Sequence, residues 1–155
     1  MPHTFTQIYV QVVFAVAFRQ SLIMPVFKEE VQKYIAGILQ RRGQKLIAIN
    51  SMPDHVHILI GQKPNVALSD LVRDVKQASS SLINQKRWVR GRFNWQEGFG
   101  AFSYSQSHLD SVIKYIRNQE RHHARKTFKH EYLALLNRFK IRYEPKYLFE
   151  FSSDE

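Results

Sequence analysis

Two histidines separated by one apolar residue form the most specific local pattern in the sequence. They stand in the run Met52-Pro-Asp-His-Val-His-Ile-Leu-Ile60. The side chains of a strand alternate between its two faces, so His55 and His57 point to one face and Val56 to the other. Two imidazoles at positions i and i+2 are well placed to share one divalent metal ion. The pair is therefore a candidate metal site.

The same pattern also has a purely structural explanation. Polar rings in an apolar strand cost desolvation free energy unless they have hydrogen-bond partners, and such partners need not include a metal. Asp54 could orient one of the rings from behind, or it could be a turn residue bonded to its own backbone. From the strand alone, both explanations stay open.

A third ligand must come from another element, and the sequence contains no cysteine. Tyr115 and Gln119 are four residues apart in a predicted helix, so they share one face at the border of its apolar stripe. His122 continues that face by one more turn. Because a tyrosine at this border is commonly a core residue and a glutamine an exposed one, the spacing alone does not assign their role.

Hydrophobic periodicity and turn residues predict the elements that must position these side chains. Strands are predicted at 6–16, 45–52, 54–61 and 99–105, and helices at 25–43, 68–82, 107–125 and 128–139. A capping box at Ser107–Asp110 should open the third helix, and the aromatic tail at 143–151 should pack on a surface. The order β-α-β-β-α-β, followed by C-terminal helices, predicts a ferredoxin-like α+β sandwich with an antiparallel sheet. The open face of such a sheet is a common platform for nucleic acid, and we expect the site to lie on it.

Composition limits the class of protein. The 155 residues suit one compact domain, and the absence of cysteine excludes a disulfide scaffold, a thiolate zinc site and a thiol nucleophile. No apolar stretch reaches the ~18 residues of a membrane span, and the N-terminus lacks the basic region of a signal peptide. We therefore expect a cytoplasmic protein without a membrane partner.

The charge indicates a polyanionic partner. The chain carries 23 Lys and Arg against 13 Asp and Glu, a net charge of +10, and residues 61–130 alone hold thirteen bases and five acids. One basic segment interleaves cations with an aromatic ring, which suits single-stranded nucleic acid, although the indole could equally pack in the core. Its candidate DNA-binding residues are Lys86, Arg87, Trp88, Arg90 and Arg92. Arg117 and Arg121 on the tyrosine helix could brace a DNA backbone or simply be solvated.

Taken together, these motifs resemble the small single-tyrosine HUH transposases of minimal insertion sequences, the insertion-sequence-two-hundred-like family. The likeness rests on His55-Val-His57, on Tyr115-x-x-x-Gln119 and on the run Trp95–Ser105. It covers nearly the whole chain. It implies a single HUH transposase domain over residues 1–155, with the core sheet and helices at 5–105 and the tyrosine and C-terminal helices at 107–155.

The resemblance also implies an activity and a set of site residues. His55, His57 and Gln119 would hold a Mg or Mn ion, and Tyr115 would be the nucleophile. Such transposases cleave and rejoin single-stranded DNA through a 5′-phosphotyrosine and use no nucleotide cofactor. They recognise hairpins near the ends of the element and act as homodimers, in which the tyrosine helix of one subunit can serve the histidines of the other.

The first strand departs from the pattern of this family, and other functions are compatible with the same residues. The family commonly carries a histidine in its first strand, where this chain reads Val10-Gln-Val12, so a domesticated or inactive relative is an alternative. A non-catalytic nucleic-acid-binding module would need no metal at the histidines. A hydrolase that activates water with the histidine pair would need no tyrosine.

Overall fold

Four antiparallel strands form one sheet, in a computed structural model that describes residues 3–149. The strands are β1 (Tyr9–Ala15), β2 (Lys45–Met52), β3 (His55–Gly61) and β4 (Gly100–Tyr104), in the order β2-β3-β1-β4. The strongly apolar β1 is buried along almost its whole length because it lies between two other strands. This order and the α+β class confirm the predicted ferredoxin-like arrangement.

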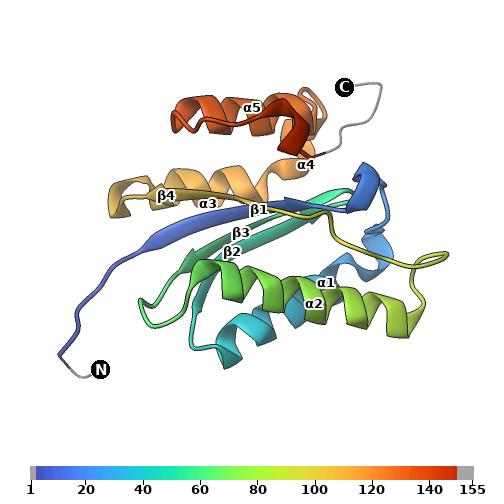
Figure 1. Cartoon of the computed structure of the whole chain (residues 1–155), viewed down its shortest axis with the longest axis horizontal. Coiled ribbons are helices and arrows are strands. Elements are labelled where there is room, and N and C mark those ends of the chain that lie inside the picture. The colour runs from blue at the N-terminus through green and yellow to red at the C-terminus, as the bar shows by residue number, and fades with distance from the viewer. Residues whose placement is uncertain (1–2, 150–155) are drawn as a thin grey trace.

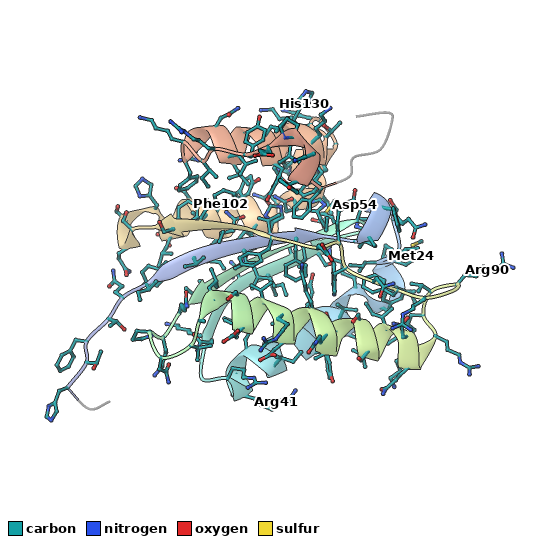
Figure 2. All side chains as sticks on the ribbon, in the orientation of Figure 1. Met24, Arg41, Asp54, Arg90, Phe102 and His130 are labelled. Carbon is teal, nitrogen blue, oxygen red and sulfur yellow. The ribbon has the colours of Figure 1, made fainter. Side chains whose placement is uncertain are left out.

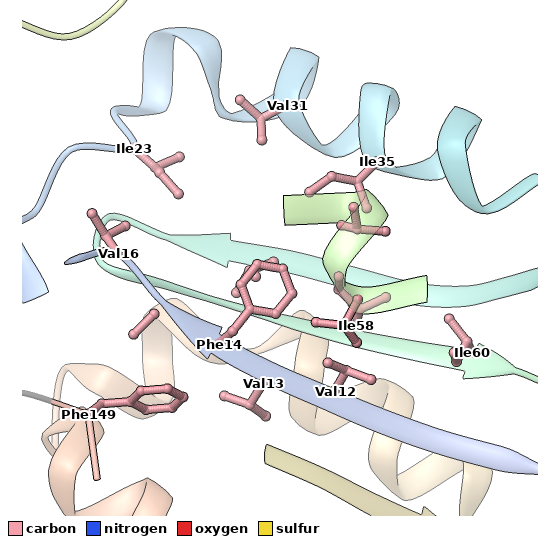
Figure 3. Close-up of a cluster of buried hydrophobic side chains, with 14 of the residues drawn as sticks. Val12, Val13, Phe14, Val16, Ile23, Val31, Ile35, Ile58, Ile60 and Phe149 are labelled. Carbon is pink, nitrogen blue, oxygen red and sulfur yellow. The ribbon is translucent and has the colours of Figure 1, made fainter. Parts of the chain in front are cut away.

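Two long helices cover one face of the sheet (Figure 1). They are α1 (Pro25–Arg41), which begins with a proline at its first turn, and α2 (Leu68–Lys86). Their apolar stripes pack on the strands, and Figure 3 shows Val31 and Ile35 of α1 facing Phe14 and Ile58 of the sheet. This layer is the main hydrophobic core.

Three shorter helices cover the other face, so the prediction of an open sheet face is wrong. They are α3 (Leu109–Arg117), α4 (Gln119–His123) and α5 (Phe128–Arg138), and Figure 1 shows them stacked on the side opposite α1 and α2. Val112 and Ile116 of α3 pack on Leu59, while Phe139 packs on Phe102. The apolar side chains on this face of the sheet need a cover, and the C-terminal helices supply it.

The predicted helix at 107–125 is broken at Asn118, where α3 ends and α4 begins. The buried Asn50 amide of β2 donates to the carbonyl oxygens of Ile116 (2.9 Å) and Arg117 (3.4 Å). These carbonyls would otherwise accept intrahelical hydrogen bonds, so Asn50 provides the partner that makes the break tolerable. The predicted capping box does not form either, because α3 begins after a short 3-10 turn (Gln106–His108) without a side-chain cap.

The C-terminal segment packs on the helical layer as predicted. Thr127 caps α5 by accepting a hydrogen bond from the His130 amide (3.2 Å). After a 3-10 turn (Pro145–Tyr147), Phe149 is buried against the Tyr132 ring at a centroid distance of 4.8 Å. Residues 150 and 151, also part of the predicted tail, lie outside the described residues. A third 3-10 turn (Ala17–Arg19) follows β1, and no helix within residues 3–149 has the length and apolar character of a membrane span.

The approach of α5 to the sheet gives a test of this layer. A Cβ at Gly100 would lie 2.7 Å from the hydroxyl oxygen of Tyr132 and 2.8 Å from its ring. We expect Gly100→Ala to lower the free energy of unfolding by about 1–3 kcal/mol, because a buried tyrosine ring must move. Urea unfolding would measure the change, and in a Tyr132→Leu background the cost should shrink.

A second glycine supplies the control. A Cβ at Gly37, inside α1, would meet nothing within 4 Å, so Gly37→Ala should stabilise the protein by about 0.5–1 kcal/mol. Equal costs for Gly100→Ala with and without the Tyr132 ring would contradict the close approach of α5 to β4.

Candidate metal and tyrosine site

The histidine pair lies in the middle of the sheet and is buried beneath the C-terminal helices. The side chains of His55 and His57 are 1% and 0% exposed. The predicted partner Asp54 contacts His55, with its Oδ1 2.7 Å from Nδ1. A carboxylate at this distance accepts the Nδ1 proton, which leaves the Nε2 lone pair of His55 facing the helical layer.

Gln11 of β1 contacts the Nδ1 of His57 as Asp54 contacts that of His55. The sequence alone did not assign Gln11 to the site. Its Oε1 lies 2.7 Å from His57 Nδ1, and its amide nitrogen donates to the hydroxyl of Tyr104 at 2.9 Å. The same amide thus contacts both the His57 ring and the Tyr104 hydroxyl. The position at which the first strand departs from the family pattern thus orients one of the two histidines.

Tyr115 and Gln119 reach the same place from α3 and α4. Gln119 is fully buried, and its Oε1 lies 3.4 Å from the Nε2 of His55. The Tyr115 ring meets His57 edge-on, at a centroid distance of 5.7 Å. The break at Asn118 does not separate them, because the Gln119 amide still reaches the Tyr115 carbonyl at 3.4 Å. The structure therefore brings the four residues of the predicted site together.

Two further side chains belong to this cluster and were missed from the sequence. Glu131 of α5, with only 1% of its side chain exposed, places Oε1 2.9 Å from the Nε2 of His57. Its Oε2 accepts a hydrogen bond from the Tyr115 hydroxyl and another from the Gln119 amide at 3.0 Å. His123 of α4 places Nε2 3.2 Å from Glu131 Oε1 and 3.0 Å from Gln119 Oε1.

The sequence did carry a signal for Glu131. It is three residues after Phe128 and four before Leu135, on the apolar stripe of its helix. A carboxylate on a buried stripe needs a partner, and this requirement marks it as a residue of interest. His123 is four residues after Gln119, which places both side chains on one side of the helix.

The donor set fits a divalent cation. His55, His57, His123 and Glu131 each offer a ligand atom, and these four atoms lie within 4.8 Å of one another. Imidazole nitrogens together with a carboxylate oxygen bind ions such as Mn²⁺ and Zn²⁺. A buried group that could hold a metal ion is thus present, with Asp54 and Gln11 behind two of its rings.

Burial and charge shift the acid-base properties of the cluster. Burial lowers the pKa of His55 to about 4. Burial and the neighbouring Glu131 carboxylate raise the pKa of Tyr115 well above its ordinary value. Burial by itself would raise the pKa of Glu131, but the His57 and His123 imidazoles outweigh it and lower that pKa. At neutral pH the site therefore holds a neutral His55, a protonated tyrosine and an ionised carboxylate.

A cavity of about 510 Å³ opens beside Tyr115, between α3 and α5. Tyr104, Tyr115 and Glu131 form part of its wall, and cationic side chains, Lys126 and Arg138, line it as well. A cavity with apolar walls and nearby cations suits a phosphate-linked ligand that approaches the tyrosine.

The predicted DNA-binding residues lie on the surface. Lys86, Arg87, Arg90, Arg92, Arg117 and Arg121 are exposed. Figure 2 shows Arg90 at the outer end of its loop, pointing away from the ribbon. Trp88 is half-buried and stacks on Phe27 with a centroid distance of 4.9 Å, so one face of the indole is already covered. This contact agrees with the alternative that the Trp88 indole packs against the core.

The fold is similar to two solved structures. One is a Deinococcus radiodurans protein described as a candidate transposase, with a TM-score of 0.58 and 22% identity, covering 76% of this chain and 94% of that one. The other is a REP-associated tyrosine transposase bound to a REP hairpin, with a TM-score of 0.60 and 14% identity, covering 78% and 72%. At these identities the likeness shows that the chain has the fold of such transposases.

Sequence comparison then gives the family. Residues 4–119 match the family model described as IS200-like transposase. The chain is also 24% identical over 120 residues to the ISDra2 transposase TnpA of Deinococcus radiodurans, which covers 73% of this chain and 84% of that relative. The protein belongs to the IS200-like transposase family, as the resemblance of its motifs predicts.

The low pKa of His55 predicts an acid-sensitive fold. Between pH ~6.5 and ~4 the unfolded chain binds a proton at this residue that the folded chain does not, so stability must fall as the pH is lowered. The loss from His55 should be on the order of 3 kcal/mol over this window. Urea unfolding of chelator-treated protein at pH 7.0 and 4.5 would measure it.

Two variants isolate the contribution of His55. His55→Asn should remove that part of the pH dependence, whereas the exposed His130→Asn should leave it in place. An unchanged slope in folded His55→Asn protein would contradict this assignment.

Proposed function

We propose that this transposase cleaves and rejoins single-stranded DNA at the ends of an insertion sequence, through a 5′-phosphotyrosine on Tyr115. One observation carries the proposal: the Tyr115 hydroxyl and the Nε2 of His57 contact the same carboxylate, that of Glu131. A nucleophile and a candidate metal ligand set thus share one hydrogen-bonded cluster within a single chain.

The cation site supplies the activation that a tyrosine needs. A phenol has an ordinary pKa of about 10 and is a weak nucleophile at neutral pH. A divalent ion, Mg or Mn, held by His55, His57 and Gln119 would act as a Lewis acid on the scissile phosphate and stabilise its developing charge. The imidazole and amide ligands are neutral, so they do not themselves reduce the positive charge that the ion would offer to the phosphate.

The reaction exchanges one phosphodiester for another. The Tyr115 oxygen forms a bond to phosphorus while the bond from phosphorus to the 3′ oxygen breaks. As the bond to phosphorus forms, the phenolic proton leaves along the hydrogen bond to the Glu131 carboxylate and on to solvent, and the departing 3′ oxygen takes up a proton from water to become a hydroxyl. In the second step the 3′-hydroxyl of another strand attacks the phosphotyrosine, and the phenol is restored. The exchange needs no nucleotide cofactor.

The proposed substrate is single-stranded DNA with hairpins. Three features support it: the basic charge of the chain, the cavity beside Tyr115 and the similarity to other transposases. The cavity beside Tyr115 gives a DNA strand a route to the nucleophile that the buried histidines themselves do not offer. The structurally similar REP-associated transposase is bound to a hairpin, and we propose that this chain likewise recognises hairpins at the ends of its element. We further propose that it acts as a homodimer, in which the tyrosine helices can be shared between subunits.

The nucleophile can be tested directly. Full-length protein is incubated with Mn²⁺ and a labelled, hairpin-bearing single strand, and a denaturing gel detects the covalent adduct. Tyr115→Phe should abolish the adduct because it removes the attacking oxygen. Tyr147→Phe, at a tyrosine that is 76% exposed, should form the adduct as the wild type does.

Two results would overturn the assignment. An adduct that persists in Tyr115→Phe would show that another residue is the nucleophile. Cleavage by the wild type without any adduct, retained in Tyr115→Phe, would favour the hydrolase alternative.

The exposed basic segment predicts a change in salt dependence. If Arg90 and Arg92 each neutralise one phosphate of a single strand, replacing both by Gln should reduce the log–log salt slope of DNA binding by about 1.4. Fluorescence anisotropy at several salt concentrations would measure the slope. The control is Arg42→Gln, an exposed arginine that pairs with Asp74 at 2.9 Å. An unchanged slope in the double variant would place the DNA elsewhere on the protein.

A further inference from the structure

We propose that His123 and Glu131 complete the cation site, so that three imidazoles and one carboxylate hold the ion and favour Mn²⁺ or a similar transition metal over Mg²⁺. The inference deepens the proposed function and rests on it. It assigns two ligands on α4 and α5, beyond residues 4–119 that the family model matches.

Each of the three histidines turns its Nε2 toward Glu131 and its Nδ1 away from it. In all three histidines, an oxygen acceptor lies at hydrogen-bond distance from Nδ1, so Nδ1 carries the proton of the neutral ring. The three acceptors are Asp54 Oδ1 for His55 (2.7 Å), Gln11 Oε1 for His57 (2.7 Å) and the Lys126 carbonyl for His123 (3.0 Å). A ring with its proton on Nδ1 offers the Nε2 lone pair on its other side, and this is the form of histidine that binds a metal ion.

The three Nε2 atoms meet at one oxygen of the Glu131 carboxylate. The Nε2 atoms of His57, His123 and His55 lie 2.9, 3.2 and 3.6 Å from Oε1 of Glu131. Four acceptor atoms at these separations repel one another unless positive charge lies among them. Protons on His57 and His123 could each be donated to Oε1, whereas one divalent cation could accept a lone pair from all four atoms at once.

The two oxygens of Glu131 serve different halves of the site. Oε1 faces the three imidazoles, while Oε2 accepts hydrogen bonds from the Tyr115 hydroxyl and the Gln119 amide. A cation bound at Oε1 is thereby tied to the nucleophile through one carboxylate. A fourth imidazole, that of His122, also lies near Oε2, with its Nε2 3.3 Å away. The Oε1 atom of Gln119 lies 3.0 Å from the Nε2 of His123. It offers the cation one more oxygen ligand.

Three imidazoles and one carboxylate should bind Mn²⁺ and Mg²⁺ with different affinities. Mg²⁺ favours oxygen ligands and retains several waters, whereas imidazole nitrogens suit transition metals, for which affinity rises from Mn²⁺ to the later members of the row. A set with two histidines and an amide distinguishes these ions weakly. A third imidazole and a carboxylate, held in a buried site, should distinguish them clearly.

Metal binding can be measured without any catalytic readout. Mn²⁺ is titrated into the full-length protein, free Mn²⁺ is followed by electron paramagnetic resonance, and Mg²⁺ is then added as a competitor. We expect Mn²⁺ to bind about tenfold or more tightly than Mg²⁺. His123→Asn and Glu131→Gln should each weaken Mn²⁺ binding about tenfold or more, and the exposed controls His130→Asn and Glu144→Gln should not.

A measurement on the wild type covers the case in which Glu131→Gln fails to fold. Electron spin-echo modulation of bound Mn²⁺ counts directly coordinated imidazole nitrogens, and we expect three. A count of two, or unchanged Mn²⁺ affinity in folded His123→Asn, would overturn the assignment of His123. Unchanged affinity in folded Glu131→Gln, or tighter binding of Mg²⁺ than of Mn²⁺, would overturn the ligand set.

The same samples separate this inference from the proposed function. A wild-type protein that binds Mn²⁺ as expected but forms no DNA adduct would contradict the proposed function. A normal adduct together with unchanged Mn²⁺ affinity in His123→Asn would contradict the ligand assignment alone.

Discussion

The site depends on one buried carboxylate. Glu131 is almost completely enclosed, and an ionised carboxylate in such a place costs several kcal/mol unless other groups compensate for it. Its partners come from β3, α3 and α4, so compensation requires that all three elements converge on α5. The requirement for polar partners therefore fixes where the C-terminal helices lie on the sheet, as much as their apolar stripes do.

Packing around the carboxylate makes this position specific. The Phe128 ring stacks on His55 at a centroid distance of 4.0 Å, which covers the outer side of the histidine pair. Gly100 leaves the room that Tyr132 needs to approach the sheet. The polar cluster is thus surrounded by aromatic side chains, where its electrostatic interactions are stronger than they would be in water. For a transposase, such a cluster can hold its groups in place before DNA arrives.

Burial of the histidine pair changes the view of how DNA reaches the site. A strand lying on an open sheet would meet the imidazoles directly, but α3, α4 and α5 cover that face. The cavity beside Tyr115 instead gives access to this tyrosine from one side. In the proposed function, the scissile phosphate would reach Tyr115 through this cavity, whose wall includes the cations Lys126 and Arg138.

The sequence by itself predicted the four strands, the helices apart from the break at Asn118, and the antiparallel α+β class. It also named His55, His57, Tyr115 and Gln119, which the structure places in one cluster. These depend on periodicities of two and four residues within one element, and on motifs that occur together in one family. Only the tertiary structure brought Glu131 to His57, 74 positions earlier in the chain, because the turn before α5 folds that helix back over the sheet. No local spacing encodes such a contact, since it follows from how whole helices satisfy both an apolar face and a buried charge.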